Sequence, residues 1–247
     1  MDYQRLMTGN DMVVAVMKTM GLNPPASVPG STDKTAIQMW ALATEVGQNL
    51  MREAEWTIQT ADFFQLTTIG LSEYDLPEDY DGFSNDASWN YGSRLPVIGT
   101  LTDTEWAMLK VRLQASSTFT QMYRIGPTDT SNGVSRIELL NAPTAVETLY
   151  FPYRSRGWVI RADNTRSDNL DAADDRIMLD SNLFRVALKK AWREEKGFDT
   201  TKLEKQYKDA LAKAKAADQP GRTLSLSRRA EFPYLGYLNM PDTGYGI

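Results

Sequence analysis

Hydrophobic residues recur at helical spacing near both ends of the chain and at strand spacing in its middle. Apolar residues repeat every three to four positions from Met12 to Met20, which predicts a first helix, capped by Thr8 or Asn10 and stopped by Gly21. The same spacing runs from residue 33 to residue 56 and predicts a longer amphipathic helix. The N-terminal part is therefore expected to be helical.

In the middle of the chain the period changes to two, and β-branched and aromatic residues become frequent. A capping-box sequence at Thr102–Glu105 predicts one helix within this part, beginning at Trp106. Residues 126 to 133 are rich in Gly, Pro, Asp and Ser and predict a turn between two strands. The expected strands are 62–69, 74–76, 94–98, 121–125, 135–140, 147–153 and 157–160.

Helical spacing returns near the C-terminus. One stripe runs from Leu183 to Trp192 and ends at Gly197, and a second runs from Leu203 to Ala214 behind a second capping box at Thr201–Glu204. The short loop between them predicts an antiparallel helical hairpin. From residue 218 onward the chain has no period.

This order of helices, sheet and helices predicts an α+β fold. We expect the N- and C-terminal helices to form a helical bundle, with an antiparallel β-rich domain inserted between them and an extended C-terminal tail. The predicted parts are 1–56 (N-terminal helices), 57–165 (β-rich domain with one helix), 166–217 (C-terminal hairpin completing the bundle) and 218–247 (extended tail).

Composition narrows the classes of function. The chain has 247 residues, a net charge of −5, no cysteine and no histidine. Disulfides, thiolate metal sites, cysteine nucleophiles and serine–histidine triads are therefore excluded. We expect no enzyme activity and no cofactor. The N-terminus carries no apolar stretch of signal-peptide type, and no apolar run in the sequence is long enough for a membrane span. We therefore expect assembly in the cytoplasm without membrane contact.

Charge is distributed unevenly along the chain. From Thr57 to Ala107 there are nine acidic residues against one basic residue, Arg94, and from Asp180 to Ala217 there are ten basic against six acidic residues. The simpler interpretation of the basic stretch is the solvated surface of the helical hairpin, rather than a surface for nucleic acid.

The most unusual segment is 74 to 106, where carboxylates alternate with large rings and with Pro and Gly. A solvated loop rarely exposes so many rings, and a core rarely buries so many carboxylates, so rings anchored on a domain with charges facing outward are expected. If Gly82 took the sixth position of an EF-hand loop, Pro77 and Ser88 would fall at the first and twelfth positions, and neither supplies the carboxylate expected there. No metal site is therefore predicted. The candidate subunit-facing or channel-facing acids are Asp75, Glu78, Asp79, Asp81 and Asp86.

Catalysis by carboxylates stays open as an alternative. Paired acids such as Glu78 with Asp79, or Asp174 with Asp175, can in principle hydrolyse glycosides, although nothing in the sequence places two carboxyls across a cleft. No glycine-rich phosphate-binding motif is present. The alternative function is a carboxylate-based glycan hydrolase or a glycan-binding tail component.

The C-terminal tail is too aromatic for a segment that stays free in solvent. Docking on its own domain and docking on a partner are equally compatible with the sequence. The candidate portal or partner contacts are Arg222, Arg228, Arg229, Phe232, Tyr234 and Tyr237.

Several motifs, in order, resemble head-to-tail adaptor (connector) proteins of tailed bacteriophages, in particular the tail tubular protein A group. They cover most of residues 35 to 230. The motifs are Leu-Pro-Glu-Asp-Tyr-Asp at 76–81, Asn-Asp-Ala-Ser-Trp-Asn at 85–90, Arg-Leu-Pro-Val-Ile-Gly at 94–99, Glu-Trp at 105–106, Asp-Asp-Arg-Ile-Met-Leu-Asp at 174–180, Ala-Trp-Arg-Glu-Glu-Lys-Gly at 191–197, Tyr-Lys-Asp-Ala-Leu at 207–211 and Asp-Gln-Pro-Gly-Arg-Thr-Leu at 218–224.

The resemblance implies a structural, non-enzymatic virion protein at the head–tail interface. It implies a homo-oligomeric ring, commonly of twelve copies, that binds the portal protein above and a tail or nozzle protein below, with the C-terminal tail reaching into the portal. Double-stranded DNA would pass through the ring without specific binding. An acidic lining would repel phosphate, so we expect carboxylates of 75–86 or 162–180 to face the channel, with outer solvent as the equally open alternative.

Overall fold

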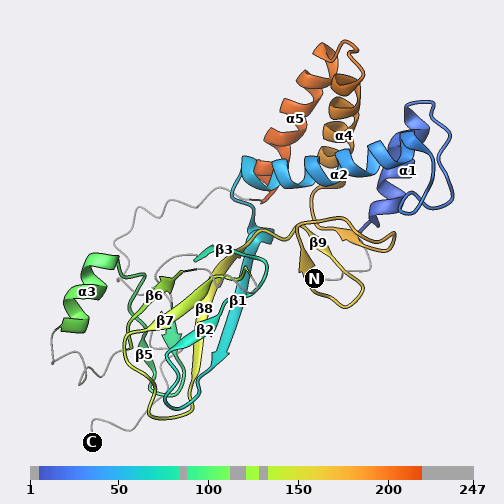
Figure 1. The fold of residues 1–247 in the computed structure, drawn as a ribbon. Helices are drawn as coiled ribbons and strands as arrows, with labels where there is room; N and C mark the ends of the chain where they lie inside the picture. The colour runs from blue at the N-terminus through green and yellow to red at the C-terminus, as the bar shows by residue number, and fades with distance from the viewer. Residues whose placement is uncertain (1–5, 84–87, 112–120, 128–132, 219–247) are drawn as a thin grey trace, which may run out of the picture.

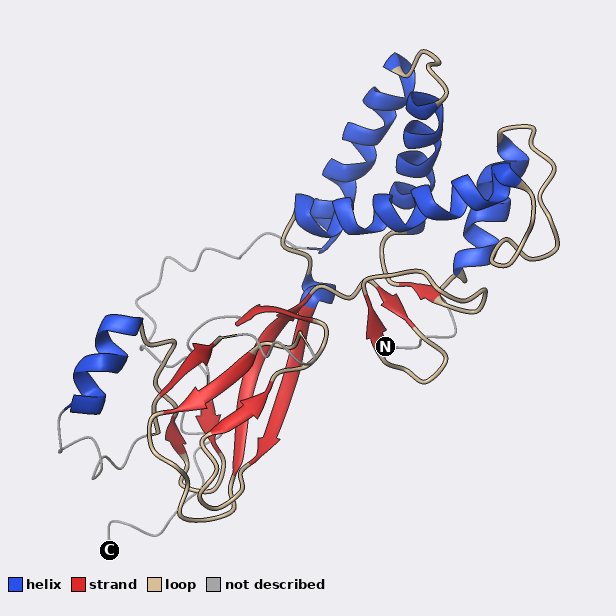
Figure 2. Ribbon diagram, viewed as in Figure 1, coloured by secondary structure: helices blue, strands red, loops and turns tan. Residues whose placement is uncertain are grey.

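The chain folds into a helical part, built from both of its ends, and a β-rich part built from its middle (Figure 1). The computed structural model describes residues 6–83, 88–111, 121–127 and 133–218. Each part has its own hydrophobic core. The α+β class expected from the sequence is confirmed, and the sheets are antiparallel (Figure 2).

Four helices share the core of the helical part. Helix α4 contacts the other three, and Figure 1 shows α4 and α5 side by side with α2 running across them. The apolar stripes read from the sequence for α1 and α4 are the faces that these helices bury. For α2 the expected stripe, which included Ile37 and Ala41, is wrong. Both of these residues are exposed, and the buried face carries Ala36, Met39, Ala43, Val46 and Leu50. The helices are α1 (Gly9–Thr19), α2 (Lys34–Glu53), α4 (Ser181–Glu195) and α5 (Thr201–Asp218).

Most helix ends follow the capping chemistry of the sequence. The Thr8 hydroxyl accepts a hydrogen bond from the Asp11 amide at 3.1 Å and begins α1. The Asp180 carboxylate accepts from the Leu183 amide at 2.7 Å and begins α4. Gly197 has a φ of +70°, which only glycine adopts without strain, and it ends α4 as expected.

The capping box expected at Thr201 is wrong. The Asp199 carboxylate accepts hydrogen bonds from the amide and the hydroxyl of Thr201, at 3.0 and 2.7 Å. Glu204 instead forms an ion pair with Lys208 at 2.8 Å along the helix surface. An aspartate two residues before the helix reached its first amide, which left the glutamate free for its i,i+4 partner.

Trp158 is central to the helical core although it lies outside the helices. Its ring is fully buried and stacks on Phe184 at 5.7 Å, and its indole nitrogen donates to the carbonyl of Asp168 at 2.8 Å. Gly47 of α2 lies against this ring, because a Cβ there would come within 2.2 Å of it. The helix therefore packs flat on the indole.

A small three-stranded sheet completes the helical part. Strand β9 (Val159–Ile160) pairs antiparallel with β10 (Arg166–Ser167) and with β11 (Arg176–Ile177). Residues 157 to 165 are expected from the sequence in the β-rich domain, whereas Trp158 and Val159 lie in the core shared with the helices. Strand periodicity alone does not tell which sheet a short strand joins.

The β-rich part is a sandwich of two sheets. In the larger sheet β8 is central, pairing with β1 on one side and with β3 and β4 on the other, and β4 pairs with β5. The smaller sheet has the order β2-β7-β6. The strands are β1 (Thr60–Leu66), β2 (Glu73–Asp75), β3 (Tyr80–Phe83), β4 (Trp89–Asn90), β5 (Leu95–Pro96), β6 (Tyr123–Gly126), β7 (Arg136–Leu139) and β8 (Thr148–Ser155).

Side chains from both sheets meet in the sandwich core. Phe151 of β8 lies 5.1 Å from the ring of Tyr123 in β6, edge to face, and Ile137 of β7 is fully buried beside them. Pro152 stands within the central strand, where the missing amide hydrogen is usually damaging. Pro152 falls between the residues of β8 that pair with β4 and those that pair with β3. On that side of β8 no described strand pairs with residue 152, so its missing amide hydrogen breaks no ladder.

Helix α3 (Asp103–Val111) begins with the expected capping box. The Thr102 hydroxyl accepts from the Glu105 amide at 3.3 Å, and the Glu105 carboxylate accepts from the Thr102 amide at 2.9 Å. Trp106 is buried, with the Arg124 guanidinium of β6 stacked over its ring at 4.6 Å. This contact holds α3 against the smaller sheet.

Strands β3, β4, β10 and β11 were not predicted from the sequence, because two to four residues are too few to show a period. Part of the expected 126–133 turn lies outside the described residues. None of the helices in the described ranges combines the length and the apolar composition that crossing a bilayer requires.

Candidate functional site

The two outer faces of the sandwich differ sharply in chemistry. The outer face of the smaller sheet carries an ion-pair lattice, in which Arg136 contacts Asp75 at 2.9 Å and Glu73 at 3.8 Å. Beside them Arg124 contacts Glu138 at 2.7 Å. Alternating buried and charged residues of this kind are usual where an antiparallel sheet faces water.

The outer face of the larger sheet is aromatic. Its exposed residues are Phe64 (54% exposed) and Leu66 (61%) from β1, with Trp89 (45%) and Tyr91 (55%) from β4 and the loop after it. The half-buried Tyr150 of β8 joins them, with its ring 5.2 Å from Phe64 and stacked on Tyr91 at 5.8 Å. These five residues are called the aromatic face.

Strand register brings these residues together. Phe64 and Trp89 both lie opposite Tyr150 on the two sides of the central strand, which gives a row of rings across three strands. The alternating burial of β1 places Phe63 toward the core and Phe64 outward. No described residue covers this row, and contiguous apolar surface of this kind usually marks an interaction site.

One carboxylate borders the aromatic face. Asp62, two residues before Phe64 on the same side of β1, accepts a hydrogen bond from the Tyr150 hydroxyl at 2.8 Å. This bond, followed by partial desolvation, raises the pKa of Tyr150 to about 12. The phenol therefore stays neutral at physiological pH.

The acidic candidates lie on the sandwich, and three of them have partners within the chain. Asp79 is half-buried and accepts hydrogen bonds from the Tyr153 hydroxyl, at 2.9 and 3.1 Å, and from the Ser155 hydroxyl. Burial and the nearby Asp79 charge raise the pKa of Tyr153 well above its ordinary value. Asp79 is therefore part of the packing of β8.

The other acidic candidates are more exposed. Asp81 forms an ion pair with Arg154 at 2.7 Å, and Asp75 forms the pair with Arg136 described above. Glu78 is exposed between them. Asp86 lies outside the described residues.

The rings of segment 74–106 divide into two groups. Tyr74 is buried, and Tyr80 and Phe83 pack in the sandwich, where their rings are 5.1 Å apart. Burial, with the neighbouring Tyr123 as a smaller cause, raises the pKa of Tyr80 to about 12. Trp89 and Tyr91 belong to the aromatic face instead, so the segment both anchors itself and contributes to the exposed surface.

A polar cavity of about 680 Å³ opens where the two parts meet, lined by residues of α2 together with Asp81, Arg154, Arg156 and Asp168. Two of its four carboxylates lie on arginines, Asp81 on Arg154 at 2.7 Å and Asp168 on Arg156 at 3.4 Å, and a third, Glu53, accepts a hydrogen bond from the Tyr207 hydroxyl. A glycosidase requires one carboxyl that gives a proton and one that attacks or activates water. The two arginine-paired carboxylates, Asp81 and Asp168, do not provide that division of roles.

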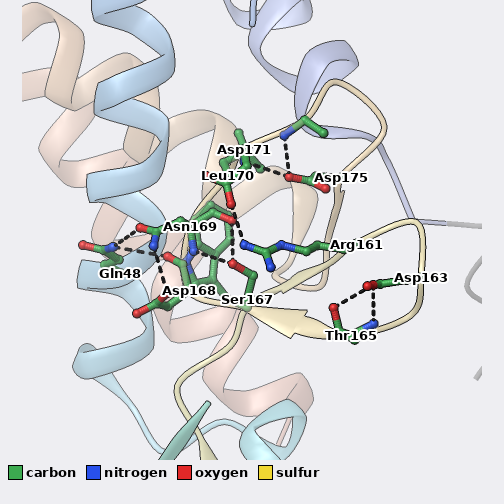
Figure 3. Close-up of polar contacts among 12 residues, drawn as sticks. Gln48, Arg161, Asp163, Thr165, Ser167, Asp168, Asn169, Leu170, Asp171 and Asp175 are labelled. Carbon is green, nitrogen blue, oxygen red and sulfur yellow. Dashed lines mark hydrogen bonds and ion pairs between the residues drawn. The ribbon is translucent and has the colours of Figure 1, made fainter. Parts of the chain in front are cut away.

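The loop from Arg161 to Asp175 is rich in aspartate and is fixed by polar contacts (Figure 3). Gln48 of α2 donates to the Asp168 carbonyl and the Asn169 side chain, at 3.2 and 3.0 Å. The buried Asp175 carboxylate accepts from the amides of Asp171 and Ala172, both at 2.8 Å. These contacts serve the backbone of the loop.

Metal binding receives no support in the part of the chain that the structure describes, where no three acidic side chains gather closely enough to hold an ion. Arg161 and Asp171 form an ion pair at 2.5 Å across the same loop. Hydrogen bonds from Thr165 lower the pKa of the exposed Asp163 carboxyl. The aspartates of this loop thus hold turns in place.

The basic hairpin of α4 and α5 is partly neutralised along its own surface. Lys190 lies 3.5 Å from Glu194 and 5.0 Å from the ring of Tyr207. Tyr207 donates a hydrogen bond to Glu53 of α2. These pairs fit a solvated helical surface that holds the bundle together.

The partner-binding candidates of the C-terminal tail lie beyond the last described residue, Asp218. They are Arg222, Arg228, Arg229, Phe232, Tyr234 and Tyr237.

Sequence reasoning missed the aromatic face as a site. Trp89 and Tyr91 belong to the unusual segment 74–106, but Phe64, Leu66 and Tyr150 fall within ordinary expected strands. The signal was available in the run Phe63–Phe64, because consecutive phenylalanines in a strand must point to opposite faces.

A scan against protein-family models and a search of curated proteins found no match to this chain.

Proposed function

We propose that this protein is a structural subunit of a tailed-phage virion, a head-to-tail adaptor that forms a ring between portal and tail. The observation that carries the proposal is the aromatic face, because an apolar sheet surface bordered by acids suits a protein that binds other proteins. The motifs that resemble adaptor proteins support it. Sequence resemblance and surface chemistry are independent arguments for one role.

The resembling motifs include residues that hold the fold. Leu76 is buried in the sandwich, Asp180 caps α4 and Trp192 is buried in the helical core. Such residues favour a shared fold more than a shared active site. Because a fold hosts many functions, the role of the ring requires a direct test.

A ring of identical subunits joins two different surfaces of the chain at each contact. The described parts offer such a pair, an acidic sandwich and a basic helical hairpin. Charges on opposite surfaces set the register between neighbours more than they add affinity. We propose a homo-oligomeric ring, of twelve copies as is common in the adaptors that the motifs resemble. The helical part would face the portal, and the sandwich would face the tail or nozzle protein.

Fewer acids are proposed for the channel lining than the sequence alone suggests. Asp75 and Asp81 lie on arginines, and Asp79 bonds two hydroxyls, so their charge is partly compensated within the chain. Exposed carboxylates such as Glu78 and Asp163 are better candidates for repelling the phosphates of passing DNA.

The test is assembly with the portal protein of the same genome. Mass photometry of the chain alone and with purified portal should show a species in which many copies join each portal ring. Trp89→Ser with Tyr91→Ser should weaken assembly, while Met108→Ser, at a side chain of α3 that is 51% exposed against 45% and 55% for the two rings, should not. A chain that ignores the portal but binds a glycan supports the alternative of a glycan-binding or hydrolytic tail component.

A further inference from the structure

The aromatic face lacks a cover among the described residues, and the sequence holds a segment suited to it. The larger sheet exposes Phe64, Leu66, Trp89 and Tyr91 side by side. We infer that, in the free chain, the C-terminal segment 219–247 docks on the aromatic face of its own sandwich. This inference concerns the unassembled chain and does not rest on the proposed function.

Reach supports docking within one chain. The last described residue, Asp218, is fixed at the start of the sandwich, where its carboxylate accepts from the Thr57 amide at 2.7 Å and hydroxyl at 2.5 Å. Strand β1 begins three residues after Thr57, so Leu66 lies at most about 30 Å away at roughly 3.4 Å per residue. The fourteen residues from Asp218 to Phe232 span up to about 48 Å when extended. The rings of the segment therefore reach the whole face.

Composition supports the same partner. The segment carries a compact apolar and aromatic run, Phe-Pro-Tyr-Leu-Gly-Tyr-Leu at 232–238. A flat row of exposed rings across three strands offers stacking partners for such side chains. Contact between rings removes apolar area of both partners from water, and each Å² removed stabilises the contact by about 25 cal/mol.

Charge complements the apolar match. Arg228 and Arg229 stand three to four residues before Phe232, and Asp62 stands two residues before Phe64 on the outward side of β1. When Phe232 lies near Phe64, the arginines come within reach of the carboxylate. The sandwich sequence is acidic, with nine acids to one base between Thr57 and Ala107, so basic residues are favoured there generally.

The consequence is that two interaction elements mask each other before assembly. A free chain would hide its aromatic face from other copies and would hide its tail from any partner. Binding of the tail elsewhere would expose the face at the same moment. The two events would then be thermodynamically coupled.

Cross-linking in the full-length chain tests this inference directly. The chain has no cysteine, so two introduced cysteines are the only thiols. Leu66→Cys with Leu235→Cys, treated with a short bismaleimide, should give a loop-closed monomer whose yield does not change on dilution. The matched control is Phe198→Cys with Leu235→Cys, because Phe198 is 63% exposed against 61% for Leu66 but lies on the helical part. We expect at least a fivefold higher yield at Leu66.

Charge reversal shows whether the contact is specific. Asp62→Lys should lower the Leu66 yield severalfold, and adding Arg228→Asp with Arg229→Asp should restore it. Equal yields at Leu66 and Phe198 would overturn the inference. A cross-linked dimer that grows with concentration would also overturn it, since the cover would then come from a second copy.

Discussion

Replacing Asp79 by alanine is the sharpest test of how the acidic segment works. In the structure its carboxylate accepts hydrogen bonds from Tyr153, at 2.9 and 3.1 Å, and from Ser155. Ser155 is fully buried and Tyr153 nearly so. Asp79→Ala would leave two hydroxyls in the sandwich without this acceptor.

The expected loss follows from these contacts. Hydrogen bonds to charged groups each contribute about 1.5–3 kcal/mol, and the terms within one network are not additive. We therefore expect Asp79→Ala to destabilise the sandwich by about 3 kcal/mol, against about 0.5 kcal/mol for the exposed neighbour in Glu78→Ala. Asp79→Asn keeps one acceptor oxygen and should fall between them.

Hydrogen exchange of strand β8 (148–155) is the suitable assay, because it reports the sandwich separately from the helical part. A loss of about 3 kcal/mol corresponds to a more than 100-fold faster exchange of its protected amides, at about 1.4 kcal/mol per factor of ten. Equal exchange in the Asp79→Ala and Glu78→Ala variants would refute the reasoning, and Asp79 would again be a candidate for a channel or a site.

Three further perturbations test other contacts. On a free helix, Gly47→Ala would gain about 1 kcal/mol of helix propensity. Here a Cβ would lie 2.2 Å from Trp158, so the variant should lower the free energy of unfolding of the helical part in urea by about 1–3 kcal/mol. A stabilised variant contradicts the close packing. The neutral phenol of Tyr80, with a pKa of about 12, favours folding below pH 10, and this contribution is lost as the pH rises from 10 through 12; the melting temperature of Tyr80→Phe should fall less over that range, and identical curves contradict it. Arg124→Ala removes the guanidinium that β6 places over Trp106 and leaves only Lys110 of α3 itself over that ring, so hydrogen exchange of α3 should speed up more than that of β7; equal effects contradict the anchoring role.

Local chemistry predicted the parts of the fold that depend on neighbours in the sequence. The capping box at Thr102, the cap at Thr8 and the stop at Gly197 all involve residues within a few positions of one another. The apolar spacing of α1 and α4 likewise predicts the faces that these helices bury, whereas in α2 only the helix, and not its buried face, was predicted. These signals are readable because the interacting groups are covalently close.

What the sequence did not predict depends on distant partners. Asp79 bonds Ser155 seventy-six positions away, and Phe64 meets Tyr150 only because β8 is the central strand. Single-sequence patterns carry no information on which strands pair, so they give neither the anchoring of Asp79 nor the row of rings across three strands. The run Phe63–Phe64 indicates only that one ring of β1 points outward.

Trp158 illustrates the same limit at the boundary between the two parts. A strand-like run from residue 157 to residue 160 follows a long strand of the sandwich, and the order of the sequence predicts that it belongs to the same domain. Its indole instead fills the space left by Gly47 under α2. Close packing of a glycine on a ring leaves no periodic signal in the sequence.

Electron cryo-microscopy of the chain mixed with the portal protein of its genome tests the central claim most directly. The account predicts a closed ring of this protein on the portal, with the helical part at the portal and the sandwich pointing away. A portal without bound ring, at concentrations where both proteins are folded, would contradict it.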